Sequence, residues 1–69
     1  MPLDTLARAF LEARSAAGWT QAELAARAGV ARATVARIER GEGGLSIGTL
    51  QRVAAVLGRQ LEVGLVEGE

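Results

Sequence analysis

The chain has 69 residues, enough for one small domain, and it contains no cysteine and no histidine. It therefore has no disulfide, no thiolate metal ligand and no imidazole base. Its acidic residues show no spacing suited to paired catalytic carboxylates or a metal site, and a Walker-type phosphate loop is excluded because lysine is absent. We expect a protein that is not an enzyme and binds no metal or cofactor. No apolar run approaches the ~20 residues that span a bilayer and no signal-peptide core is present, so we expect a cytoplasmic protein without membrane contact.

The net charge is zero, but the charges are unevenly distributed along the chain. Four arginines lie between positions 27 and 40, where Glu39 is the only acid. The tail from Glu62 to Glu69 carries three acids and no base. One surface can therefore be basic although the whole chain is neutral.

The first helix is predicted to begin at Asp4 or Thr5, either of which can cap it, and to run to about Ala17. Gly18 should end it. Four apolar residues at helical spacing form one stripe: Leu3, Leu6, Phe10 and Ala13.

The second helix is predicted from Gln21 to about Ala28. Thr20 begins a Thr-x-x-Glu capping box with Glu23, in which each side chain can bond to the backbone amide of the other residue. Gly29 follows the helix and is suited to the positive φ that a helix end commonly uses.

The third helix is predicted over about Arg32 to Arg40. At 100° per residue, one side carries Ala31, Thr34, Val35 and Ile38, and the opposite side carries Ala33, Ala36, Arg37 and Arg40. Val35 and Ile38 should then belong to the core. Ala31 stands at the N-cap position and has no hydroxyl to satisfy the first backbone amides.

The fourth helix is predicted after a loop over residues 42–45, with Ser46 as its cap, Ile47 to Leu57 as its span and Gly58 as its end. The residues expected to face inward are Ile47, Leu50, Val53, Ala54 and Leu57.

After Gln60 the apolar period changes from helical spacing to alternation. Leu61, Val63 and Leu65 occupy every second position, which is typical of a half-buried strand. A lone strand leaves its backbone groups unpaired. It could pair with the same strand of a second subunit, or the segment could be a frayed tail. We therefore divide the chain into a domain at 1–58 and a tail at 59–69 that serves in dimerisation.

Residues 20–41 combine a capped helix, a glycine turn and a second helix with arginines on its outer side. This is the layout of a helix-turn-helix, in which the second helix enters the major groove of DNA. The small alanines between the arginines would let the helix backbone lie close to DNA.

The chain also resembles the lambda-repressor-like, XRE family of DNA-binding domains over about residues 6–57. The matching motifs are Gly18-Trp19-Thr20-Gln21, Leu24-Ala25, Gly29-Val30, Ile38-Glu39-Arg40-Gly41, Leu45-Ser46 and the apolar pattern from Leu50 to Gly58. The resemblance implies an all-α, compact bundle of four to five helices that works as a symmetric dimer on a palindromic operator. The short C-terminal strand would pair across that dimer. Ala31, Ala33 and Ala36 replace residues that are often polar in the family.

The helix-turn-helix layout and the resemblance together suggest a set of DNA contacts: Gln21, Arg32, Ala33, Thr34, Ala36, Arg37 and Arg40. We expect Arg32 and Arg37 at base edges, because arginine can bind guanine with two hydrogen bonds. Arg40 and Gln21 are expected at phosphates. The alternative for the arginines is a solvated helix face.

Two further positions are interpreted as structural. The resemblance implies that Arg14 and Glu39 form an ion pair between packed helices. Trp19, between the first two helices, is interpreted as a core residue rather than a stacking platform for bases.

We expect a homodimeric, sequence-specific DNA-binding regulator, a transcriptional repressor, whose partner is double-stranded DNA. By resemblance, the nearest subtype is an antitoxin that represses its own operon and also binds a cognate toxin. A free-standing regulator is the next choice. The alternative from another class is a protein-interaction module of the same fold with weak DNA binding.

Overall fold

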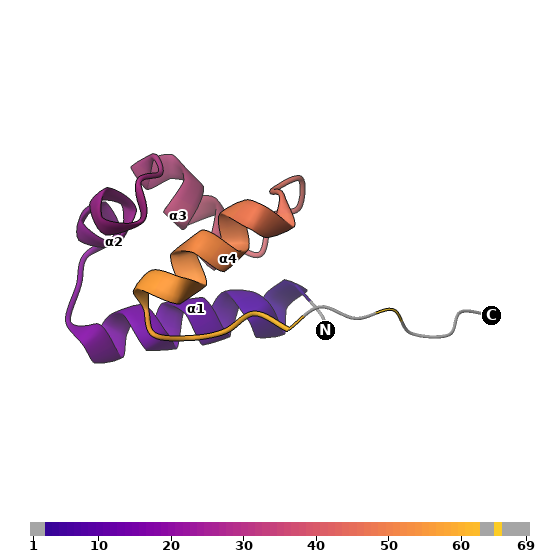
Figure 1. Cartoon of the computed structure of the whole chain (residues 1–69), viewed down its shortest axis with the longest axis horizontal. Helices are drawn as coiled ribbons and strands as arrows, with labels where there is room; N and C mark the ends of the chain where they lie inside the picture. The colour runs from indigo at the N-terminus through magenta and orange to yellow at the C-terminus, as the bar shows by residue number, and fades with distance from the viewer. Residues whose placement is uncertain (1–2, 63–64, 66–69) are drawn as a thin grey trace.

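The structure is a computed structural model that describes residues 3–62 and residue 65. In these residues it contains four helices: α1 (Leu3–Ala17), α2 (Gln21–Ala28), α3 (Arg32–Glu39) and α4 (Ile47–Val56). Figure 1 shows α1 along one side of the bundle, α2 and α3 side by side away from it, and α4 in front. The predicted all-α fold is confirmed. No described helix has the length and apolar character to cross a membrane.

The start of α2 and the turn between α2 and α3 form as the sequence predicts. The Thr20 hydroxyl accepts from the Glu23 backbone amide at 3.0 Å, and the Glu23 carboxylate accepts from the Thr20 amide at 3.2 Å. Gly29 ends α2 in the left-handed region, at φ 70°. Ala31 occupies the N-cap of α3 in extended backbone and makes no side-chain capping bond.

Three helix boundaries differ from the predictions by one or two residues. Leu3 begins α1 one residue before the predicted caps, α3 ends at Glu39 with Arg40 as its C-cap, and α4 ends at Val56 with Leu57 as its C-cap. Gly58 follows with φ 70°, so the predicted stop of α4 is correct.

The core lies between all four helices. Its largest fully buried side chains are Leu24, Val35 and Val53, which come from α2, α3 and α4. From α1, Phe10 joins them at 5% exposure. Trp19 is half-buried and packs against this core, with the Arg27 guanidinium 4.3 Å from the centroid of its ring. Each helix thus contributes one apolar face.

The inward position predicted for Ile47 is wrong, because this side chain is 48% exposed. Ile47 is the first residue of α4. At 100° per residue it lies only about 20° from the buried Ala54, so its exposure comes from its place at the N-terminal end of α4 and not from its direction around the helix. In the same helix, Val53 and Ala54 are buried as predicted.

Arg14 and Glu39 hold α1, α2 and α3 together. The Arg14 Nε and Nη2 atoms donate to the two Glu39 carboxylate oxygens at 2.6 and 3.0 Å, and its Nη1 donates to the Trp19 carbonyl at 2.7 Å. Glu39 also accepts from the side-chain amide of Gln21 at 3.0 Å. Hydrogen bonding to Glu39 raises the pKa of Arg14 despite its burial. The pair joins the C-terminal ends of α1 and α3 to the first residue of α2.

After α4, the chain turns back and runs beside α1 (Figure 1). Leu61 is half-buried against the core and lines a groove with residues of α1 and α4. Residues 59–62 have no strand structure in this single chain, whereas Leu65 is fully exposed. Val63, the remaining residue of the predicted strand, lies outside the described residues. The paired strand stays a prediction, and Leu61 has an additional role in the monomer.

We predict that Glu39→Ala lowers the free energy of unfolding by ~3–5 kcal/mol, because it leaves the mostly buried Arg14 charge without its carboxylate. Urea unfolding followed by circular dichroism measures this change. Glu42→Ala is the control, since the Glu42 side chain is 46% exposed and its loss should change stability by at most ~0.5 kcal/mol. Equal unfolding midpoints for the two variants would contradict the structural role of the pair.

We also predict that Ala31→Ser stabilises the protein by ~1 kcal/mol, because the extended N-cap backbone lets a serine hydroxyl accept from the first amides of α3. Ala33→Ser, at an exposed position inside α3, is the matched control and should not stabilise. Thermal melts of both variants test the prediction, which is wrong if Ala31→Ser melts no higher than Ala33→Ser.

Candidate nucleic-acid interface

The rotation of α3 about its axis is set by Val35 and Ile38, whose side chains are buried in the core at 1% and 4% exposure. The outer side of the helix therefore faces away from the bundle. Arg32 and Ala33 are exposed on it, and Arg40 is exposed immediately after its last residue. The predicted arginine face is therefore accessible.

Three other predicted contact residues are only partly accessible. Thr34, Ala36 and Arg37 are half-buried. Thr34 lies next to the buried Val35, as the helical wheel of the sequence implied. Ala36 has only a methyl group to offer, so the exposed arginines carry the polar chemistry of this face.

The turn before α3 holds this helix against α2. The Val30 amide donates to the Ala25 carbonyl at 3.0 Å, and the Gly29 amide donates to the Ala26 carbonyl at 3.3 Å. Val30 is half-buried on the core, and Ala28 is buried in it. The two helices thus form one rigid unit with the arginine face outward.

The three arginines differ in their contacts. Arg32 makes no hydrogen bond or ion pair within the described residues. The Arg37 Nη2 donates to the Gly43 carbonyl at 3.0 Å, and its Nε lies 3.6 Å from a Glu42 carboxylate oxygen. Arg40 donates through Nε to the other oxygen of Glu42. Two of the predicted DNA contacts are therefore engaged within the free protein.

Glu42 is the residue of this face that sequence reasoning missed. The hydrogen bond from Arg40, supported by the charges of Arg40 and Arg37, lowers the pKa of the Glu42 carboxyl. The carboxylate therefore stays ionised to a lower pH than that of an ordinary glutamate. Its proximity to Arg40, two residues before it in the chain, was a signal in the sequence, but the loop conformation decides whether the two meet.

The Gln21 side chain is not free to contact a phosphate in this structure. Its side-chain amide donates to Glu39, so it belongs to the network that holds the helices together. Its backbone is at the first turn of α2, where amides are available to an anion. A DNA contact by Gln21 stays a prediction.

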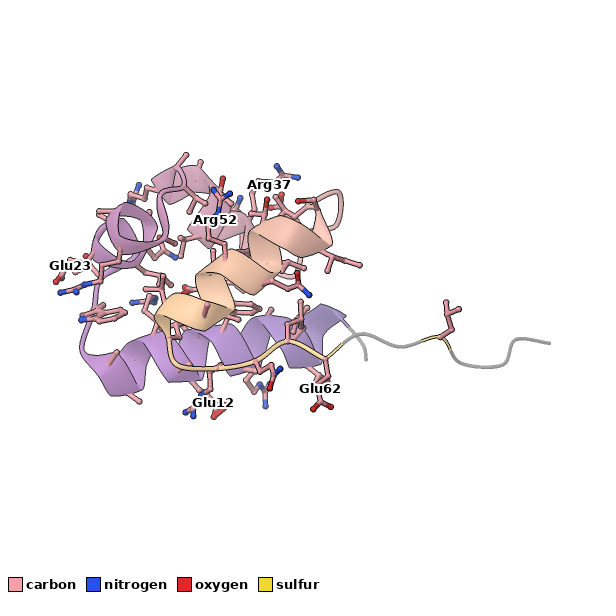
Figure 2. All side chains as sticks on the ribbon, viewed as in Figure 1. Glu12, Glu23, Arg37, Arg52 and Glu62 are labelled. Carbon is pink, nitrogen blue, oxygen red and sulfur yellow. The ribbon has the colours of Figure 1, made fainter. Side chains whose placement is uncertain are left out.

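The arginines of α3 are gathered in one part of the molecule. Figure 2 shows Arg37 beside the loop between α3 and α4, whereas Glu12 and Glu62 lie on the far side, along α1 and the tail. Arg32 and Arg40 are on or next to the same helix as Arg37. A neutral chain thus presents a basic face at α3.

Comparisons with known proteins agree with this geometry. The HTH_3 family, described as helix-turn-helix, matches residues 10–63. No curated protein matched the chain. Among solved structures, an HTH_3 family transcriptional regulator from Vibrio cholerae is 30% identical with a TM-score of 0.76, and the alignment covers 87% of this chain and 34% of that one. This chain thus spans about a third of that regulator.

Two other solved structures are similar. The apo form of HppE is 34% identical with a TM-score of 0.74, over 87% of this chain and 34% of that one. A chain of the HipA–HipB–O2–O3 complex is 25% identical with a TM-score of 0.80, over 97% of this chain and 94% of that one. The last similarity extends over nearly the whole of both chains. The family match and the α2–α3 geometry together show that this chain belongs to the HTH_3 helix-turn-helix family, with the lambda-repressor-like, XRE-type fold.

Proposed function

We propose that the protein is a homodimeric, sequence-specific DNA-binding repressor of transcription. The observation that carries the proposal is the orientation of α3, which buries Val35 and Ile38 and leaves a short helix with an arginine face outside the bundle. In a helix-turn-helix, the second helix lies in the major groove with its first residues at the base edges.

Within this proposal, Arg32 and Arg37 read bases and Arg40 binds a phosphate. Arg32, the first residue of α3, is exposed and has no competing contact within the described residues. Arginine binds guanine through O6 and N7 with two parallel hydrogen bonds, which accounts for specificity with few reading side chains. Arg40 lies beyond the helix end, where backbone contacts position a protein on DNA.

The dimer would use the tail. Leu65 is fully exposed in the single chain, and the alternating pattern continues from the half-buried Leu61. Pairing with the same segment of a second subunit would cover Leu65 and satisfy the strand backbone. Two α3 helices would then enter major grooves about one helical turn apart, ~34 Å.

The proposal extends to a protein partner. In this form the repressor is the antitoxin of a toxin–antitoxin pair and binds its toxin. It is supported by the similarity to a chain of the HipA–HipB–O2–O3 complex, of which this chain covers 94%. The second candidate is a protein-interaction module with weak DNA binding. It is favoured by the zero net charge and by the two alanines, Ala33 and Ala36, on the outer side of α3.

We predict that Arg37→Ala reduces discrimination at one operator position by ~1–3 kcal/mol, because a guanine contact is lost. Fluorescence anisotropy against a palindrome selected from random DNA measures this, with single-base variants of the site. Arg8→Ala, an exposed arginine on α1, is the matched control. If Arg37→Ala keeps the parent's base preference, α3 is not the reading helix as proposed. If neither the parent nor the control binds DNA, the interaction module is the better function.

We predict that truncation after Glu62 weakens the dimer and the operator affinity together, because it removes Leu65 and keeps Leu61 on the core. The helical circular-dichroism signal should not change, since all four helices end before residue 57. Sedimentation velocity of the truncated and full chains measures the dimer. A truncated dimer as tight as the parent would place dimerisation on the helices instead.

A further inference from the structure

The loop after α3 places one carboxylate between two arginines of the proposed DNA-binding face. Each oxygen of Glu42 faces the Nε atom of a different arginine, Arg37 at 3.6 Å and Arg40 in a direct hydrogen bond. All three side chains are partly exposed, so the cluster lies at the surface where a ligand can reach it. The cluster does not stabilise the core, and the role proposed for the arginines does not account for Glu42.

The backbone holds Glu42 in this place. The Glu42 amide donates to the Arg37 carbonyl at 3.1 Å, and the Gly41 amide donates to the Ile38 carbonyl at 3.1 Å. Gly41 has φ 72°, a conformation that favours glycine, and this reverses the chain directly after α3. The turn itself therefore fixes the backbone of Glu42 next to the arginines, from where its side chain reaches them.

A DNA phosphate would seek the same donors. Phosphate oxygens and carboxylate oxygens both accept hydrogen bonds from guanidinium groups with similar geometry. Glu42 occupies the Nε of Arg40, faces the Nε of Arg37, and carries a negative charge that repels a nearby phosphate. Together the three groups carry a net charge of +1, whereas the arginines alone would carry +2.

We propose that Glu42 is an internal competitor of the DNA backbone: on DNA of arbitrary sequence, where Arg37 has no matching base to read, the Glu42 carboxylate takes the place of a phosphate on Arg37 and Arg40 and lowers the affinity for DNA. This inference rests on the proposed DNA-binding function. The electrostatic, sequence-independent part of binding is the part affected, because it depends on how many phosphates the protein neutralises. Glu42 thereby lowers the affinity for DNA of arbitrary sequence and makes stable binding depend more strongly on base contacts.

The test compares Glu42→Gln with Glu12→Gln. Both changes remove one negative charge and keep the side-chain size, but Glu12 lies on α1, on the far side of the molecule from Arg37 (Figure 2). The probe is a fluorescent duplex of arbitrary sequence, titrated by anisotropy from low to high salt. Circular-dichroism melts of both variants check that the fold is unchanged.

We expect Glu42→Gln to bind this duplex about three- to tenfold more tightly than the parent at low salt. The plot of log affinity against log salt should steepen by about one phosphate equivalent, and the gain should vanish at high salt. Glu12→Gln should change the affinity less than Glu42→Gln at low salt, and by less than about twofold once salt exceeds ~0.1 M, because it lies on α1 away from Arg37 and its charge is then screened.

A second comparison links the gain to the arginines. In an Arg37→Ala/Arg40→Ala background, Glu42→Gln should no longer increase affinity. A gain that persists there would overturn the proposal, since net charge alone would explain it.

The remaining outcomes separate the inference from the proposed function. If the parent binds DNA and Glu42→Gln binds equally or more weakly, the competitor role is wrong and the proposed DNA binding stands. Weaker binding would show that Glu42 positions the arginines for DNA. If no variant binds DNA at low salt, the proposed function itself is contradicted, and the inference falls with it.

Discussion

The ion pair of Arg14 and Glu39 is the contact on which the arrangement of the helices depends. Its two charges are mostly buried, and such charges are tolerated in a protein only when they are paired and hydrogen-bonded. Here every part of the pair has a partner: Arg14 also binds the Trp19 carbonyl, and Glu39 also accepts from Gln21. Because Glu39 is the last residue of α3, the pair fixes the end of that helix to α1 and to the start of α2.

The ion pair helps to hold the short helix α3 in place, with its arginine face outward. An isolated helix of eight residues would not be stable in water, because nucleation costs more than so few hydrogen bonds return. Tertiary contacts must hold it at both ends. The glycine turn and Val30 hold its start, the ion pair holds its end, and Val35 and Ile38 set its rotation. The outer side of α3 makes no contact with the core, so arginines there are available for binding.

Much of the fold could be predicted because its signals are local. The capping box of Thr20 and Glu23, the left-handed Gly29 and the stop at Gly58 each involve residues within one helical turn, and the structure contains all of them. The start of α1 differs from the prediction where two residues could cap the helix, and α3 and α4 end one residue early because their predicted last residues are C-caps. Ile47 was misplaced because helical periodicity gives an angle but not which neighbour lies beside it.

The sequence by itself determined the helices, the buried face of α3 and the family, since spacing and capping depend on residues close together in the chain. Only the tertiary structure decided which of several side chains meet. It places the Gln21 amide on Glu39, Leu61 in the groove beside α1, and Glu42 between two arginines. The contacts of Gln21 and Leu61 depend on where helices distant in sequence come to lie. Glu42 meets Arg37 and Arg40, its neighbours in the chain, because a glycine at positive φ reverses the turn after α3. Such contacts follow from packing in three dimensions, which periodicity along one chain does not encode.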